Sequence, residues 1–115
     1  MSTDEHRISA DRARVLIASG EATALDVRKD EQWLERRVPA ATHVEEDDLS
    51  ERIEELPDEG QIIVISQDGE RSEQIAEKLR ERGLDAVSIE GGMEAWEKEQ
   101  FPMQPSTDPD EDVRV

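Results

Sequence analysis

Short apolar clusters alternate with longer amphipathic stretches along most of the chain. The clusters are rich in Ala, Val, Ile and Leu and are bounded by polar or turn-forming residues, which is typical of buried β-strands. One cluster consists of four consecutive β-branched residues, a composition that favours a strand over a helix. The predicted strands are Ala22–Val27, Ala41–Val44, Ile62–Ile65 and Ala86–Ile89.

The stretches between these clusters show helical periodicity. Ser9 is a candidate N-cap, and Gly20 and Gly83 stand where a chain usually leaves helical geometry. Strands that alternate with helices across short connections predict βαβ units, and hence an α/β fold with a mainly parallel sheet and helices on both faces. The predicted helices are Ala10–Ser19, Asp30–Arg36, Leu49–Glu55, Arg71–Arg82 and Met93–Glu99.

The regular pattern ends near Phe101 and Pro102. The segment that follows, "QPSTDPDEDVRV", is polar, acidic and contains proline, which predicts a disordered tail. A chain of 115 residues can bury one modest core. We therefore predict one folded domain over residues 5–103 and an acidic disordered tail over residues 104–115.

The net charge of the chain limits the kinds of partner that it can bind and indicates the salt concentration in which it works. Asp and Glu number 31 against 14 Lys and Arg, giving a formal net charge of -17. Such a surface repels nucleic acid and anionic membranes, so we expect neither as a partner. Self-repulsion is relieved by salt, which shortens the screening length to about 3 Å at 1 M. We predict a halophilic protein, although an ordinary acidic protein has a similar composition.

Two absences exclude whole classes of function. The chain has no cysteine, which excludes disulfides, thiolate catalysis and cysteine-based metal sites. The sequence also shows neither the apolar core of a signal peptide nor a run of 18 apolar residues. We expect a cytoplasmic monomer without a cofactor. The acidic run Glu45–Asp48 lacks the alternation of a calcium loop, so no metal site is predicted.

One loop carries the residues of an anion site. "SQDGERS", from Ser66 to Ser72, follows the strongest strand and opens a predicted helix. Backbone N–H groups and the positive end of the helix dipole then point at one place. Gly69 lets the loop curl, and Arg71 adds a guanidinium. Taken alone, the same residues also fit an ordinary turn with a solvated arginine.

Four motifs in order give the loop a context. "ALDVR" begins at Ala24, "VPAA" at Val38, the loop itself at Ser66, and "GGMEAW" at Gly91, the last followed by "FP". Together they resemble the single-domain rhodanese family of sulfurtransferases, over roughly Ile8 to Pro102. The resemblance implies about five largely parallel strands flanked by helices. In active members a loop cysteine takes a sulfane sulfur from a donor such as thiosulfate, holds it as a persulfide and passes it to a thiophilic acceptor.

The resemblance also assigns roles to positions of this chain. Ser66 stands in the nucleophile's place, and the anion-binding loop is Gln67, Asp68, Gly69, Glu70 and Arg71. The structural motif residues are Asp26, Arg28, Gly91, Gly92 and Trp96. Arg36, Arg37 and Ala40 stand where the family usually has Gly, His and Gly. Gln32 stands where an acidic partner for Arg28 is common, which leaves Glu31 as a candidate partner.

Serine is a poor substitute for the cysteine in that reaction. A thiol with a reference pKa of about 8.5 ionises readily at a helix N-terminus, whereas a hydroxyl stays protonated and needs an adjacent base. Oxygen cannot hold a persulfide, which is a sulfur–sulfur bond. The candidate bases are Asp68 and Glu70 in the loop, with His6 and His43 elsewhere; we interpret the two carboxylates as opposing anion binding and the two histidines as surface or core-edge residues.

Two functions follow from this reasoning. The first is a rhodanese-like domain without sulfurtransferase activity, a binding or regulatory module whose partner is a small anion or a protein. The second is an enzyme: either a thiosulfate-type sulfurtransferase in which Ser66 was introduced in place of a natural cysteine, or a domain in which serine performs an unrecognised transfer with a loop carboxylate as its base. The sequence alone leaves both open.

Overall fold

A parallel sheet forms the centre of the computed structural model, which describes residues 6–56, 60–101 and 103–105. Its five strands follow the order β1-β6-β5-β2-β4, and each neighbouring pair is parallel. The predicted α/β fold class is therefore confirmed. The strands are β1 (Arg7–Ile8), β2 (Ala22–Asp26), β4 (Thr42–His43), β5 (Gln61–Ile65) and β6 (Asp85–Ile89).

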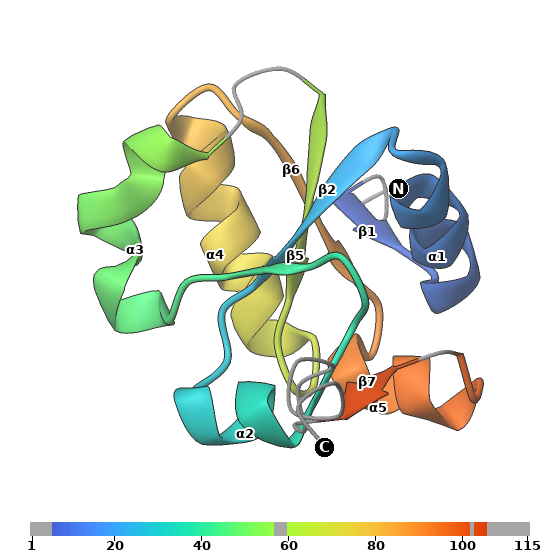
Figure 1. Cartoon of the computed structure of the whole chain (residues 1–115). Coiled ribbons are helices and arrows are strands. Elements are labelled where there is room, and N and C mark those ends of the chain that lie inside the picture. The colour runs from blue at the N-terminus through green and yellow to red at the C-terminus, as the bar shows by residue number, and fades with distance from the viewer. Residues whose placement is uncertain (1–5, 57–59, 102, 106–115) are drawn as a thin grey trace.

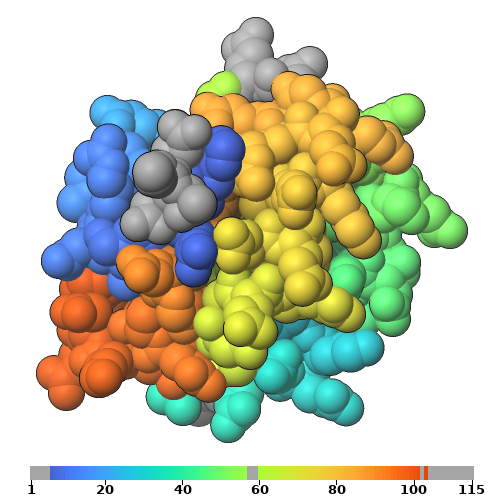
Figure 2. All heavy atoms as spheres, turned by 180° about the vertical axis from the view of Figure 1, so that it is seen from behind, coloured from blue at the N-terminus to red at the C-terminus, as the bar shows by residue number. Residues whose placement is uncertain are grey.

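Helices cover both faces of this sheet (Figure 1). Helices α1 (Ala10–Ser19) and α5 (Gly92–Lys98) lie on one face, and α3 (Glu46–Arg52) and α4 (Glu70–Glu81) lie on the other. The short helix α2 (Asp30–Glu35) lies beyond the end of the sheet at which β2 and β5 finish. Figure 2 shows α4 in yellow and gold between the blue N-terminal segment and the green α3.

The apolar run of strand β5 is continuous because helices cover both faces of this strand. Ile63 and Ile65 belong to the core shared with α1 and α5, whereas Ile62 and Val64 belong to the core shared with α3 and α4. All four side chains are fully buried. Because successive side chains of a strand point to opposite faces, a central strand covered on both faces needs an apolar residue at every position.

Several predicted boundaries were wrong. Helix α3 begins at Glu46 rather than Leu49, because the acidic side chains of its first turn suit the positive end of the helix dipole. Its last predicted turn, Ile53–Glu55, is a separate 3-10 helix, η2. The predicted strand Ala41–Val44 shortens to the two residues of β4, and Arg36 lies in a strand rather than in α2.

A two-stranded antiparallel ribbon lies beside the main sheet. It pairs β3 (Arg36–Arg37) with β7 (Gln104–Pro105), and the sequence pattern predicted neither strand. Regular structure therefore reaches Pro105, past the predicted domain end at residue 103. Residues 106–115 of the predicted tail lie outside the described residues. In the described part of the chain, no helix combines the length and apolar character needed to cross a membrane.

Candidate functional site

The predicted anion loop lies at the carboxyl end of β5, the central strand. Ser66 follows the strand directly, and α4 begins at Glu70. Gly69 caps the helix with φ at 95°, a left-handed conformation that glycine adopts without strain. Ligands of open parallel sheets bind at this edge. The structure thus brings the loop to the position that the sequence predicted.

Ser66 is a buried hydrogen-bond acceptor. Its side-chain oxygen accepts the backbone N–H groups of Gly69, at 3.2 Å, and of Ser72, at 2.9 Å. Ser72 in turn donates its hydroxyl to the Gly69 carbonyl at 3.0 Å. Ser66 is only 4% exposed. A hydroxyl has two acceptor lone pairs, so the Ser66 oxygen uses both to close the loop.

The Gly91–Gly92 turn forms the back wall of the loop. The N–H of Met93 donates to the Ser66 carbonyl at 2.8 Å, and that of Glu94 donates to the Gln67 carbonyl at 3.1 Å. A Cβ at Gly92 would lie 2.5 Å from the Ser66 carbonyl oxygen. Two of the predicted structural positions, Gly91 and Gly92, therefore support the loop by close backbone contact.

Asp26 and Arg28 form a buried ion pair beside the loop. Arg28 Nη2 lies 2.9 Å from Asp26 Oδ2, and the side chains are 4% and 0% exposed. Arg28 Nε and the Arg28 backbone N–H also donate to Asp26, and Nη2 donates to the Arg36 carbonyl. The predicted partner Glu31 was wrong, because Glu31 is exposed while Asp26 ends a buried strand and needs a partner there.

A cavity of about 310 Å³ opens in front of Ser66. The chain has a formal net charge of -17, yet three cationic side chains and only two carboxylates line this cavity: Arg28, Lys29 and Arg71, with Glu46 and Asp68. Sequence reasoning missed Lys29 and Glu46 as cavity residues. Lys29 follows the "ALDVR" motif directly, which is a usable signal, whereas nothing in the pattern links Glu46 to the loop.

Arg71 lies at the mouth of this cavity. Its Nε donates to Glu46 Oε1 at 2.7 Å, and its Nη1 donates to Gln74 Oε1 at 3.4 Å. The Arg71 side chain is 60% exposed. The guanidinium is therefore held by a carboxylate from α3 across the cavity.

The loop amides are only partly engaged. The exposed Asp68 accepts the N–H of Glu70 through Oδ1 at 3.1 Å. The hydrogen bonds of the described residues leave the N–H groups of Gln67, Asp68 and Arg71 available. The exposed side chain of Glu70 begins α4. The loop can thus still present N–H donors to an anion.

Both tryptophans pack against other rings. Trp96 is 2% exposed, belongs to the core under α1 and α5 and meets Phe101 edge to face at 5.2 Å. We predicted a structural role for Trp96, and the structure places its ring in this core. Trp33 is half-buried and stacks on His43 at 4.7 Å, with Arg37 over its ring at 4.9 Å.

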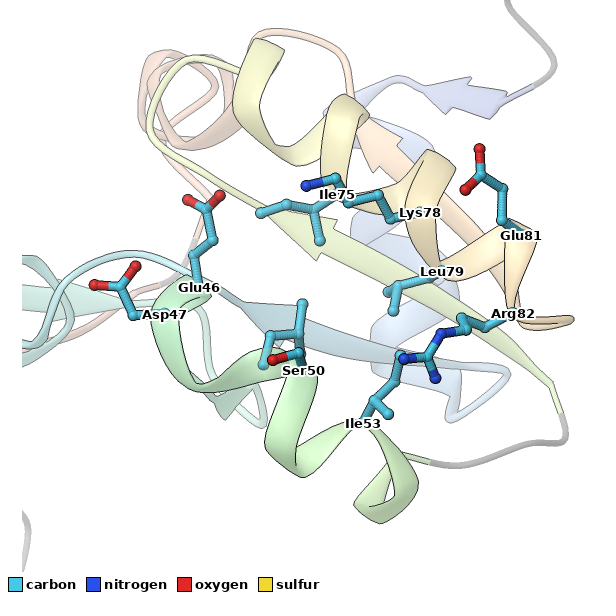
Figure 3. Close-up of a pocket in the computed structure, with 10 residues that line it drawn as sticks. Glu46, Asp47, Ser50, Ile53, Ile75, Lys78, Leu79, Glu81 and Arg82 are labelled. Carbon is cyan, nitrogen blue, oxygen red and sulfur yellow. The ribbon is translucent and has the colours of Figure 1, made fainter.

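A larger hollow of about 510 Å³ lies between α3 and α4 (Figure 3). Apolar side chains, among them Ile53, Ile75 and Leu79, line its inside, and charged side chains such as Lys78 and Arg82 stand around it. Glu46 lines both this hollow and the Ser66 cavity. The hollow holds none of the loop residues, so the candidate chemistry lies in the smaller cavity.

Comparisons with known proteins agree with this geometry. The sequence model of the rhodanese-like domain family matches residues 9–99 of this chain. A putative sulfurtransferase of Bacillus subtilis, YtwF, is 38% identical over 85 residues, 74% of this chain and 82% of its own length. The thiosulfate sulfurtransferase GlpE of Actinobacillus pleuropneumoniae is 30% identical over 105 residues, 90% and 97% of the two chains.

Solved structures show the same likeness. A rhodanese-related protein from Thermoplasma volcanium superimposes with a TM-score of 0.81 at 27% identity, covering 86% of this chain and 97% of its own. A rhodanese-like domain protein from Staphylococcus aureus superimposes with a TM-score of 0.73 at 27% identity, covering 78% of this chain and 89% of its own. The predicted resemblance is confirmed, and the chain belongs to the rhodanese-like domain family.

Proposed function

We propose that this rhodanese-like domain binds an oxyanion at the Ser66 loop and does not transfer sulfur. The observation that supports the proposal is the hydrogen bonding of Ser66, whose side-chain oxygen accepts the N–H groups of Gly69 and Ser72. By the family resemblance, Ser66 stands at the position of the nucleophile. The two curated relatives are named as sulfurtransferases. This chain has no cysteine at any position, so it has no sulfur atom that can form a persulfide.

A serine nucleophile is not supported either. A hydroxyl needs a general base within hydrogen-bond reach. Within the described residues, no histidine or carboxylate is hydrogen-bonded to the Ser66 oxygen. Asp68, the nearest acid in the chain, directs its carboxylate to the N–H of Glu70. These contacts favour a structural role for the Ser66 hydroxyl.

Oxyanion binding rests on what the cavity still offers. The N–H groups of Gln67, Asp68 and Arg71 are available, and Lys29 and Arg71 supply positive charge. Hydrogen bonds between such donors and a charged acceptor contribute about 1.5 to 3 kcal/mol each. Arg71 is paired with Glu46, and Lys29 is paired more loosely with Asp47. Both pairings reduce this attraction, and the shorter one makes Glu46 the residue to change first.

Titration with sulfate or thiosulfate tests the binding proposal. Backbone amide signals of Gln67, Asp68 and Arg71 should shift and saturate, while that of Gly20, outside the loop, should not. Glu46→Gln should bind more tightly because it frees the guanidinium, and Arg71→Gln more weakly. Absence of a saturable shift in both the Ser66 chain and its Glu46→Gln variant would contradict the proposal.

The alternative is a sulfurtransferase whose natural cysteine was replaced by Ser66, and the names of the two relatives favour it. The codon for residue 66 in the gene decides the origin of the serine. Transfer of sulfur from thiosulfate to cyanide decides the activity: we expect none from the Ser66 chain and turnover from Ser66→Cys. Activity of the Ser66 chain would refute our proposal, and an inactive Ser66→Cys would refute the alternative.

A further inference from the structure

A second group of chemically active side chains lies outside the Ser66 cavity. Asp30, His43 and Glu45 each offer one donor atom, and these atoms all lie within 4.8 Å of one another. The three residues come from the first turn of α2, from β4 and from the connection to α3. Their separation along the chain explains why the sequence pattern predicted no metal site here.

The contacts of His43 leave one ring nitrogen directed at the acids. Nε2 lies 2.8 Å from the Arg28 carbonyl oxygen, an acceptor, so Nε2 must carry the hydrogen of that bond. In the neutral ring, Nδ1 then carries a lone pair and no hydrogen. It lies 3.6 Å from Asp30 Oδ1. Two acceptors that face each other repel unless a proton or a metal cation lies between them. Metal-binding histidines commonly donate their other N–H to a backbone carbonyl in this way.

The backbone holds these donors in place. The N–H groups of Val44 and Glu46 donate to the carbonyls of Asp26 and Val27, at 3.0 and 3.3 Å. These bonds fix the residues on either side of Glu45 to the last residue of β2 and to the residue that follows it. Trp33 stacks on the His43 ring with an interplanar angle of 6°. The site is therefore supported on elements of the main sheet.

The carboxylates keep some freedom to adjust. Glu45 Oε2 accepts the backbone N–H of Asp30 at 2.6 Å, and its second oxygen has no such partner among the described residues. The Asp30 side chain is 73% exposed, so solvent and not packed protein surrounds most of it. For bonds of about 2.1 Å, tetrahedral donors lie roughly 3.4 Å apart. The three donor atoms already lie within 4.8 Å of one another, so small side-chain movements bring them to bonding geometry.

We propose that Asp30, His43 and Glu45 bind one divalent transition-metal ion, Zn²⁺ being the best fit. One imidazole nitrogen and two carboxylate oxygens are donors that Zn²⁺ accepts, and the two negative charges balance the ion. Mg²⁺ and Ca²⁺ prefer oxygen donors and gain little from the imidazole. Three protein donors leave a fourth position for water, as in open zinc sites.

Calorimetric titration of the chelator-treated full chain with Zn²⁺ tests this site. It is carried out in about 1 M KCl, which screens diffuse binding to the acidic surface, and at about pH 8, because the ligands bind deprotonated. We expect saturable binding of one ion per chain, and His43→Gln and Glu45→Gln should each weaken it at least tenfold. Glu45→Gln keeps an oxygen that can accept the Asp30 N–H. Its effect on Zn²⁺ affinity therefore measures the loss of the negative charge.

Two matched variants and one direct readout complete the test. His6→Gln and Asp47→Asn remove a histidine and a neighbouring exposed acid outside the cluster, and both should bind Zn²⁺ as the natural chain does. In the natural chain, the nitrogen-15 signal of His43 Nδ1 should move with Zn²⁺ while Nε2 stays protonated. Absence of saturable binding, unchanged binding by His43→Gln, or Mg²⁺ binding as tight as that of Zn²⁺ would each overturn the proposal.

Discussion

Ser66 and Ser72 are joined by a hydrogen bond that closes the loop, from the Ser72 backbone N–H to the Ser66 side-chain oxygen at 2.9 Å. The same oxygen also accepts the N–H of Gly69. A single hydroxyl therefore satisfies two buried donors at the start of α4. At the position that we assign to the family's nucleophile, the Ser66 oxygen thus holds the fold of the loop.

Ser66→Ala should destabilise the protein by about 2 kcal/mol or more, because it leaves two buried N–H groups without an acceptor. Urea unfolding followed by circular dichroism measures the change. Ser50→Ala is the matched control, since Ser50 is exposed on α3 and its loss should be almost neutral. Equal stabilities of the two variants would show that the Ser66 hydroxyl is not a structural acceptor.

Gly92→Ala should be among the most destabilising single changes in the loop region. Its φ is 59°, and an added Cβ would meet the Ser66 carbonyl oxygen at 2.5 Å, so left-handed strain and a backbone clash together should cost about 3 kcal/mol or more. Gly20 also has a positive φ, of 82°, but its Cβ would meet nothing within 4 Å. Gly20→Ala should therefore cost only about 1 to 2 kcal/mol.

Thermal and urea unfolding of these two glycine variants separate the clash from the backbone strain. If both changes cost the same, the contact between the Gly-Gly turn and the loop does not support the loop. If Gly92→Ala folds well enough for spectroscopy, the amide signals of Ser66 and Gly69 should shift in this variant. In Gly20→Ala the same two signals should stay where they are in the unchanged chain.

Arg28→Ala should destabilise the protein by about 3 to 5 kcal/mol, because it leaves the fully buried Asp26 carboxylate without its partner. Arg52→Ala is the control: Arg52 and Glu55 form an ion pair with side chains 45% and 61% exposed, and such pairs contribute about 1 kcal/mol at most. Arg28→Lys should fall between them, since lysine keeps the charge but cannot donate along the same fork. A loss for Arg28→Ala no larger than for Arg52→Ala would contradict the buried pair.

The sequence was enough to predict the fold because each central element carries its own signal. The run Ile62–Ile65 is buried on both faces, so its position shows in the residues themselves. The "GGMEAW" motif predicted a structural role for Gly91 and Gly92, and the structure shows their contact with the loop. Strand pairs of two residues, such as β3 with β7, are too short to leave a periodic pattern.

The composition of the site was harder to predict because its side chains come from distant segments. Glu46 and Arg71 are 25 positions apart, and their ion pair depends on how α3 packs beside α4. The same holds for Asp30 and His43, which β4 brings together when it pairs with β2. Arg28 was assigned the wrong partner because the pattern does not show which nearby acid shares its buried position, and the structure shows that this acid is Asp26.

The excess of acidic side chains leads to the last prediction, that salt stabilises this protein. At a formal charge of -17, repulsion acts over a screening length of about 30 Å at 0.01 M salt but only about 3 Å at 1 M. The midpoint of thermal unfolding should therefore rise from dilute buffer to molar KCl. Sucrose of equal osmolality controls for solvent exclusion and should raise the midpoint less. A midpoint that is unchanged by KCl, or raised equally by sucrose, would show that charge repulsion does not limit the stability of this fold.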